Sequence, residues 1–492
     1  MGAPAQVINN TVHYVEGDAS APGNSNFENL LDWCETNSID AVIQLGPGYH
    51  QLTFTDALEL SQNYVITGAG KRATLIHVNS TDPDCFLDFT GCVEMSSLTI
   101  YGDALTSANL IELNGDDSVL RDLVMDVDND HASLYSVAIA IYANGVTVER
   151  VRFEGEFPAD EVLLIGDGSN ACTGTLIRDC WFGSATGATY GCASNTAIWV
   201  AGLVYNCNIE HCHWYGYDGD TAGFRVGSNT RGVNMRHCWF EMYPEDTSDV
   251  YGRAIYYSGD TGVMDGHGEV YKCTIHCAQT GDYYQNGAVE LNQKVNFHHN
   301  KLFTAFFGYD DHLRGALVVE SSAEWLNIND NHFNCNYGDG SVTYMGGCAV
   351  YFDGAIANLT FCRNEIVGCD LDTALGAVYG LCVKFDSIVT AAIFDQNQIN
   401  FSSADITSRN VTAVGDDGSA LLSWSSCMGN VFEPPSPGTY AGYCFRSASL
   451  NYVVATGNIC RSDNTLSDAA GSNIIWGDGG TTLPGSNQQT AT

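Results

Sequence analysis

The 492-residue sequence predicts an all-β chain, wound as a single-stranded, right-handed parallel β-helix (a solenoid) of about a dozen turns with an N-terminal capping helix. Three observations lead to this fold. A short motif recurs about every thirty residues, an alternating apolar segment keeps step with it, and helical periodicity is missing outside the N-terminal segment. Repeating units of this length stack into solenoids, because one unit cannot bury its apolar face alone.

The recurring motif has an apolar residue, two further residues, a position that we call the anchor, one more residue and a second apolar residue. Its clearest copies are IRDCWF, with Cys180 as the anchor, and MRHCWF, with Cys238. The thirteen anchors are Leu98, Leu123, Val151, Cys180, Cys212, Cys238, Cys273, Asn300, Asn331, Asn364, Asn397, Asn430 and Asn458. Their mean spacing is thirty residues. Regular spacing predicts that equivalent positions stack from turn to turn, about 4.8 Å apart.

A second element precedes the anchors at a similar distance in each unit. Its copies include TAIWVAG (196–202) and CAVYFDG (348–354). Alternating apolar and polar residues that end on Gly, Ser, Asn or Asp predict a half-buried strand followed by a turn. The anchors then face the interior, where small thiols pack without partners and stacked Asn side chains hydrogen-bond from turn to turn.

The N-terminal segment differs from the repeats. NFENLLDWCETN (26–37) has helical spacing and predicts a helix that covers the open edge of the first turn. The expected organisation is an N-terminal arm over 1–25, the capping helix and first turn over 26–60, the parallel β-helix over 61–465, and a polar tail over 466–492.

The charge balance restricts the partners. Nineteen Lys and Arg stand against 58 Asp and Glu, which gives a net charge of −39. Such a chain repels nucleic acid, anionic lipid and polyanionic substrates, so we do not expect a uronate substrate. Strong acidity also suits a protein that works in concentrated salt, where screening removes self-repulsion. Nineteen cysteines are not expected of such a protein, so the charge alone does not decide between the two interpretations.

The sequence shows no targeting or membrane signal. Its first residues, MGAPAQVINN, contain neither the basic nor the apolar region of a signal peptide, and no stretch of eighteen apolar residues occurs. We expect synthesis in the cytoplasm and no membrane insertion. The cysteines do not form CxxC pairs, so we expect mostly buried free thiols.

Two segments after the capping helix carry a resemblance. LGPGYHQLTF (45–54) and YVITGAGKRATLIHV (64–78) are similar to the first turns of the pectin-lyase-like superfamily, particularly of phage tailspike and depolymerase proteins. The resemblance extends from about residue 26 to 460. It implies contact with carbohydrate, either as an enzyme that cleaves a polysaccharide or as a protein that only binds one.

The motifs of polygalacturonase-like hydrolases are not present in their order. DGHGEV (265–270) precedes YDDHLRG (309–315), whereas the GHG motif follows the DD motif in those enzymes, and no RIK-like segment follows. We interpret both matches as chance. Whether the protein is an enzyme is left open by the sequence.

The residues that flank the anchors are the candidate binding site. If an anchor points inward, its two neighbours point outward. Flat aromatic rings beside polar donors suit sugar rings, although tryptophan also marks subunit interfaces, and both interpretations stay open. No metal-ligand spacing such as HxxxH occurs, so we expect no metal and no cofactor. The candidates are Trp181, His211, His213, His237, Trp239, His299, Lys301 and His332.

Carboxylates are the candidates for catalysis. A glycoside hydrolase needs two carboxyl groups about 5 to 10 Å apart, and adjacent turns can supply such pairs. An acidic β-helix also produces such pairs by accident. The candidates are Glu320, Asp353 and Asp386, which follow the second strand element, and Asp330 nearby.

Three functions remain. The first is a virion-surface protein (a tailspike, turret or head-decoration protein) that is made in the host cytoplasm, forms a homotrimer with other virion proteins as partners, and binds host-surface polysaccharide. The second is a polysaccharide depolymerase, either a glycoside hydrolase or a lyase. The third is a purely structural, capsid-stabilising protein whose aromatic strip is an interface. A symmetric trimer suits the first.

Overall fold

The computed structural model divides the chain into two compact units, Met1–Gly219 and Asp220–Thr492, which we call the first and second units and describe separately. The described residues are 12–17, 26–54, 58–80, 85–103, 108–127, 135–155, 161–169, 171–183, 196–215, 222–242, 253–258, 268–280, 288–307, 316–319, 323–335, 349–367, 379–385, 387–400, 410–416, 421–423, 426–433, 442–447, 449–460, 465–469, 473–476 and 488–489.

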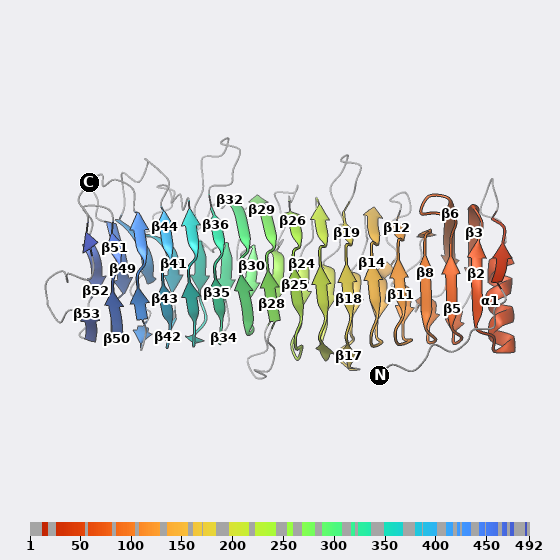
Figure 1. Cartoon of the computed structure of the whole chain (residues 1–492), viewed down its shortest axis with the longest axis horizontal. Coiled ribbons are helices and arrows are strands. Elements are labelled where there is room, and N and C mark those ends of the chain that lie inside the picture. Colours follow the sequence, from red (N-terminus) through yellow and green to blue (C-terminus); the bar gives the residue numbers. More distant parts are fainter. Residues whose placement is uncertain are drawn as a thin grey trace. The chain divides into compact units, whose positions relative to one another are not determined.

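Both units are parallel β-solenoids in which successive turns add strands to three sheets, A, B and C (Figure 1). All strand pairs with a described register are parallel, and each strand pairs with the equivalent strand of the next turn. The prediction of an all-β parallel solenoid is confirmed.

The first unit contains the helix α1 (Asn26–Asn37) and the following strands. Sheet A has β1 (Val12–Val15), β2 (Ala41–Leu45), β5 (Tyr64–Thr67), β8 (Val93–Ser96), β11 (Val119–Arg121), β14 (Thr147–Glu149), β18 (Leu176–Arg178) and β22 (Asn208–Glu210). Sheet B has β3 (Gly48–Phe54), β6 (Thr74–Ser80), β9 (Thr99–Asp103), β12 (Val124–Val127), β15 (Arg152–Gly155), β19 (Trp181–Phe182) and β23 (His213–Tyr215). Sheet C has β4 (Leu58–Leu60), β7 (Cys85–Phe89), β10 (Ala108–Leu113), β13 (Tyr135–Ile141), β16 (Glu161–Ile165) and β20 (Thr196–Val200), and β17 (Cys172–Thr173) pairs separately with β21 (Val204–Tyr205).

The second unit repeats this plan. Sheet A has β25 (Asn234–Arg236), β28 (Gly268–Tyr271), β31 (Val295–His298), β34 (Ala323–Glu324), β35 (Asn327–Asn329), β38 (Ile356–Ala357), β39 (Thr360–Cys362), β42 (Val389–Thr390), β43 (Ile393–Asp395), β46 (Leu421–Ser423), β47 (Ser426–Met428), β50 (Ser449–Thr456) and β53 (Asn473–Trp476). Sheet B has β26 (Trp239–Met242), β29 (Thr274–Thr280), β32 (Lys301–Phe307), β36 (His332–Asn334), β40 (Glu365–Val367), β44 (Gln398–Asn400), β48 (Val431–Glu433), β51 (Ile459–Cys460) and β54 (Gln488–Gln489). Sheet C has β24 (Ala222–Val226), β27 (Arg253–Tyr257), β30 (Val289–Leu291), β33 (Leu317–Val319), β37 (Val350–Phe352), β41 (Tyr379–Phe385), β45 (Asn410–Asp416), β49 (Gly442–Ser447) and β52 (Thr465–Ala469).

The number of turns differs from the predicted dozen. Within the described residues, sheet B has seven strands in the first unit and nine in the second, so the second unit alone forms about nine turns. The anchor motif begins only at Leu98, and the strands β3 and β6 precede it, so counting anchors misses those turns. The predicted terminal segments also contain strands: β1 pairs with β2, and β53 pairs with β50.

The anchors lie in the interior of both units, as predicted, and all thirteen are at most 3% exposed. In the second unit the Asn anchors form a hydrogen-bonded ladder. The Nδ2 of Asn331 donates to Oδ1 of Asn364 at 3.0 Å, and the Nδ2 of Asn364 donates to Oδ1 of Asn397 at 3.2 Å. In addition, each Oδ1 accepts a backbone N–H from the preceding anchor, as in Asn331 to Asn364 at 3.0 Å. The ladder therefore satisfies buried polar groups that would otherwise cost free energy.

Buried rings and thiols fill the remaining interior. In the first unit Phe153, Phe182 and Trp214 stack in succession, with ring centroids 4.9 and 5.0 Å apart. Twelve cysteines have described side chains; all twelve are free thiols, and ten of them are buried. Burial raises the pKa of the Cys277 thiol to about 12, which keeps it protonated and unreactive at neutral pH.

The helix α1 is fixed to the first turns. It buries Phe27, Leu31 and Cys34. Its Glu35 carboxylate accepts hydrogen bonds from the Ser61 hydroxyl at 2.6 Å, the Gln62 N–H at 3.2 Å and the Tyr64 hydroxyl at 2.6 Å. Burial opposes ionisation of Glu35, but these hydrogen bonds outweigh it and lower its pKa.

Candidate functional site

Each anchor follows a sharp corner between a sheet A strand and a sheet B strand. The residue before the anchor is in the left-handed region: φ is 55° at His211, 55° at His237 and 59° at His299. The residue after the anchor begins the sheet B strand, as Trp181, Trp239 and His332 do. The sequence pattern was interpreted as one strand face, whereas the structure divides the candidates between a corner row and the outer face of sheet B.

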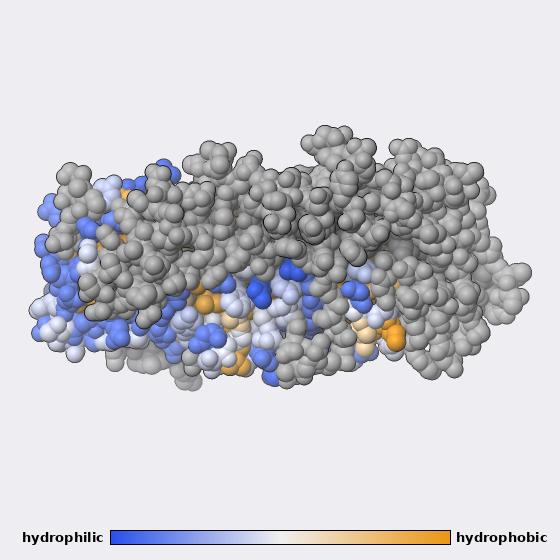
Figure 2. Space-filling view, turned by 180° about the vertical axis from the view of Figure 1, so that it is seen from behind, coloured by the Kyte–Doolittle hydropathy of each residue, from blue (hydrophilic) through white to orange (hydrophobic). Residues whose placement is uncertain are grey.

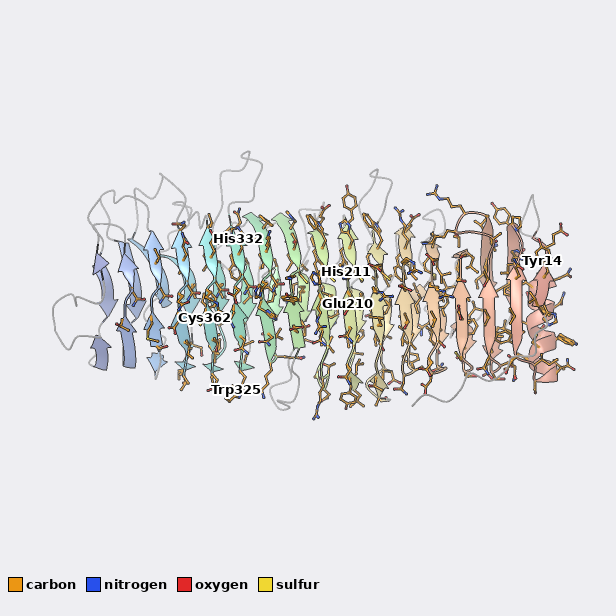
Figure 3. All side chains as sticks on the ribbon, in the orientation of Figure 1. Tyr14, Glu210, His211, Trp325, His332 and Cys362 are labelled. Carbon is orange, nitrogen blue, oxygen red and sulfur yellow. The ribbon has the colours of Figure 1, made fainter. Side chains whose placement is uncertain are left out.

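The second unit has eight such corners, two of them glycines (Gly429 and Gly457). We call the six with side chains the corner row, and all six have φ between 52° and 59°: His237, Lys272, His299, Asp330, Arg363 and Gln396. Their backbone N–H groups donate to the next turn, for example His299 to the Asn329 carbonyl at 3.1 Å. The left-handed backbone turns the chain so that the next residue enters the core, while the corner side chain stays outside. In the first unit, Figure 3 shows His211 at the same kind of corner, directly after Glu210.

The first-unit candidates form one aromatic cluster on sheet B. The Trp181 ring lies 4.2 Å from the His213 ring and 5.9 Å from the ring of Tyr215, which is 39% exposed. The Arg152 guanidinium lies 5.5 Å from the Trp181 centroid and is ion-paired with Glu154. Trp181 is half-buried and covered on several sides, so it offers little open ring surface.

The second-unit candidates form a longer row, which we call the sheet B stack: Trp239, His276, Phe303 and His332. The Trp239 ring lies over His276 at 5.3 Å and 20°, and His276 lies over Phe303 at 4.6 Å and 12°. Phe303 then approaches His332 at 6.0 Å. Trp239 is 42% exposed, and its indole N–H donates to Glu241 Oε1 at 2.8 Å. The stack therefore presents a partly exposed tryptophan ring that is held by these contacts.

The structure adds His276 and Phe303 to the predicted residues. Both lie two residues further along their strands than the position after the anchor, so they face outward on the same side. This alternation was the signal in the sequence that could have identified them. Burial lowers the pKa of His276 despite the nearby Glu241 carboxylate, so its ring is neutral at pH 7 and stacks without the desolvation cost of a charge.

A second group surrounds Tyr271, next to the corner row. The Lys272 ammonium lies 4.9 Å from the Tyr271 ring centroid, and the His299 ring lies 5.5 Å from it. The neighbouring Glu269 is held by Arg236 at 2.7 Å and by His298 Nε2 at 3.1 Å. Burial opposes ionisation of Glu269, but the hydrogen bonds from His298 and Arg236 outweigh it and lower the pKa of Glu269. Glu269 is therefore ionised, and its charge is paired with Arg236.

Lys301 extends the polar part of this surface. It is exposed and lies in register with Thr274 on one side and with His332 on the other. His332 Nδ1 lies 2.9 Å from Glu365 Oε2. The candidates His299, Lys301 and His332 therefore come from neighbouring turns of the second unit.

The carboxylate candidates are not brought together in the described part of the chain. Asp330 follows β35 and forms a two-pronged ion pair with Arg363, with both N–O distances 2.7 Å. The Arg363 hydrogen bonds lower the pKa of Asp330, which suits an ionised carboxylate and not a general acid. Asp353 follows β37 in sheet C, and its N–H donates to the Val319 carbonyl. Glu320 and Asp386 lie outside the described residues.

A buried ion pair on sheet C was not predicted. Glu290 is 0% exposed; its Oε2 lies 2.5 Å from Arg253 Nε, and its Oε1 accepts from Asn292 Nδ2 at 2.6 Å. A buried carboxylate needs such partners to stay ionised. The alternation of apolar and polar residues in the sequence does not by itself show that Glu290 is buried and not solvated.

Neither a metal site nor a membrane span is found in the part of the chain that the structure describes. Within it, no three His, Cys, Asp or Glu side chains are grouped as metal ligands. None of its helices is both long and apolar enough to traverse a bilayer, α1 having twelve residues.

Comparison with solved structures finds proteins with a similar fold. A tailspike protein mutant of E. coli bacteriophage HK620, solved in complex with a hexasaccharide, is similar with a TM-score of 0.53 and 12% identity over 94% of this chain and 77% of that one. Tailspike protein 3 of bacteriophage CBA120 gives a TM-score of 0.40 and 11% identity; the match covers 97% of this chain but only 61% of that one. A mannuronic acid specific polysaccharide family 6 lyase from human gut microbiota gives a TM-score of 0.45 and 11% identity. The match covers 81% of this chain and 88% of that one.

These similarities concern the fold. No family model matches the sequence, and no curated protein matches it. The structural neighbours include tailspikes and polysaccharide lyases or hydrolases with β-helix folds, and the resemblance predicted from the first turns is confirmed at the level of the fold. Function has to be argued from the residues of the site itself.

Proposed function

We propose that the protein is a virion-surface β-helix (a tailspike, turret or head-decoration protein) that binds a host-surface glycan on the sheet B stack of the second unit. The observation that carries this proposal is the partly exposed ring of Trp239, held in place by its neighbours. An exposed tryptophan on a regular sheet has no packing reason to be held by a hydrogen bond to Glu241 and a stacked His276.

The physical argument rests on what a sugar ring requires. Its apolar face packs against a flat aromatic ring, and its hydroxyl groups need donors and acceptors at the edge of that ring. Trp239 supplies the flat face, and Glu241, Lys301 and His332 supply polar groups along the same sheet. Because the strands are paired on both sides, little conformational entropy is lost on binding.

A single substitution with a matched control tests the site. We expect Trp239→Ala to lower the affinity for host-envelope polysaccharide about tenfold or more, since stacking on one ring contributes about 1–3 kcal/mol by analogy with base stacking. Trp325→Ala is the control: Trp325 is 54% exposed, belongs to the same unit and lies on the sheet A side, away from His332 (Figure 3). It should bind as the unchanged protein does.

The result that contradicts the proposal is equally specific. Unchanged binding by a folded Trp239→Ala protein, or an equal loss in Trp325→Ala, would show that the stack is not the glycan site. The same samples are analysed by light scattering for the expected homotrimer. Loss of the trimer in Trp239→Ala alone would identify the stack as a subunit interface, the structural alternative.

Depolymerase activity is measured in the same experiment. The chain length of the polysaccharide is followed by size-exclusion chromatography after incubation with the protein. Shortened chains would establish the enzymatic alternative, with Asp330 and Asp353 as the described carboxylates to replace first. The ion pair with Arg363 keeps Asp330 ionised, so Asp330 cannot act as a general acid. If catalysis required Asp330 as the acid, we expect the polysaccharide chains to stay uncut.

A further inference from the structure

Two of the five lysines of the chain lie on adjacent turns beside the sheet B stack. Lys272 is in the corner row and Lys301 is on the outer face of sheet B; both are exposed. Among the described residues neither lysine forms an ion pair, although the chain carries 58 carboxylate side chains. Lys272 instead lies over the Tyr271 ring, which leaves its ammonium charge uncompensated.

The carboxylates around these lysines have other partners. Glu269 is bound by Arg236 and His298, and Asp330 is bound by Arg363. On the stack itself, Glu241 accepts the Trp239 indole N–H, and Glu365 lies against His332. Each of these four carboxylates therefore has a partner other than Lys272 or Lys301.

Salt screening limits how far the net negative charge of the chain acts on a bound ligand. At physiological salt the Debye length is about 8 Å, so the net charge of −39 acts weakly on a ligand that already touches the stack. Lys301 is two strands from Trp239 through Thr274, which corresponds to about 10 Å. A sugar chain lying across Trp239 thus brings its next residues to the lysines.

We propose that the ligand of the sheet B stack is an acidic polysaccharide, whose carboxylate groups are recognised by Lys272 and Lys301. This inference rests on the proposed glycan binding and narrows its ligand class. Lysine recognises an anion as a mobile point charge with three donors, which suits repeated carboxylates on a flexible chain. The neighbouring His237 and His299 supply further donors from the same corner row.

The test compares matched ligands. Oligogalacturonate, oligomannuronate and oligosialic acid are each measured beside their carboxyl-reduced, neutral forms by isothermal titration calorimetry. We expect at least one acidic form to bind tenfold or more tightly than its neutral form at low salt, and that advantage to shrink as sodium chloride rises. Equal affinity for the members of every pair would overturn the inference and leave glycan binding intact, whereas a lack of binding by all probes would overturn both.

Matched variants assign the effect to the lysines. The double substitution Lys272→Gln and Lys301→Gln should lower the affinity for the acidic form about 25-fold and leave the neutral form unchanged, since each exposed contact contributes about fivefold. Lys294→Gln, elsewhere in the same unit, removes a like charge and should change neither affinity by more than about twofold. Trp239→Ala should weaken both forms. An acidic preference that survives in the double variant would contradict the role of these lysines.

Discussion

Replacing Asn364 by alanine tests whether the asparagine ladder stabilises the second unit. Asn364 is 1% exposed. Its Oδ1 accepts the backbone N–H of Asn331 at 3.0 Å, and its Nδ2 donates to the Ile328 carbonyl at 2.7 Å. Alanine removes both partners at once, and the cavity that it leaves is enclosed by neighbouring turns.

The magnitude follows from the two backbone groups that lose a partner. Leaving a buried donor or acceptor unsatisfied costs about 1–3 kcal/mol each. The Asn331 N–H and the Ile328 carbonyl together give about 2–6 kcal/mol for Asn364→Ala, without any term for the ladder contact to Asn397. Asn331→Ala should cost a similar amount, because its contacts repeat the same geometry one turn earlier.

Urea denaturation followed by circular dichroism measures the effect. The matched control is Asn296→Ala, because Asn296 is an exposed asparagine on the outer face of β31 in the same unit. We expect the control to change the free energy of unfolding by less than about 0.5 kcal/mol. If Asn364→Ala lies within 0.5 kcal/mol of that control, the ladder contributes nothing measurable and the reasoning is refuted.

Three further predictions concern other parts of the molecule. Glu35→Gln should destabilise the protein at pH 7 but not near pH 3, because hydrogen bonds lower the pKa of Glu35 in the folded state. The stability that this provides is present above the unfolded pKa of about 4.3 and is lost as the pH falls through the folded pKa. A difference in unfolding midpoint that is independent of pH would contradict this. Gln396 has φ of 58°, so Gln396→Val should be less stable than Gln396→Gly by about 1 kcal/mol or more in thermal unfolding, and equal stability of the two would contradict the strain argument. Arg363→Met should raise the pKa of Asp330 in an NMR titration, because the guanidinium hydrogen bonds lower it, and an unchanged titration would disprove that cause.

The sequence by itself determined the architecture. A thirty-residue period with one anchor per unit can be satisfied only by stacking equivalent positions, and all thirteen anchors are buried in the structure. The amphipathic spacing of residues 26–37 was sufficient for α1. These features are local or strictly periodic, so hydrophobic patterning specifies them without knowledge of the surroundings.

The tertiary structure alone decided which side chains meet. The corner before an anchor is glycine only at Gly429 and Gly457, and at the other eleven anchors it is Ser, Asp, Arg, His, Lys or Gln, so glycine in the sequence marks few of these left-handed positions. Contacts such as Trp239 on His276 and Arg363 on Asp330 join residues of different turns, about 33 to 37 positions apart. Which residues face one another across turns depends on the register of the parallel strands, and that register is set by packing of the whole interior. Periodicity therefore predicted the solenoid, whereas the exposure of Trp239 and the lack of a described ion pair at Lys272 and Lys301 are properties of the folded surface.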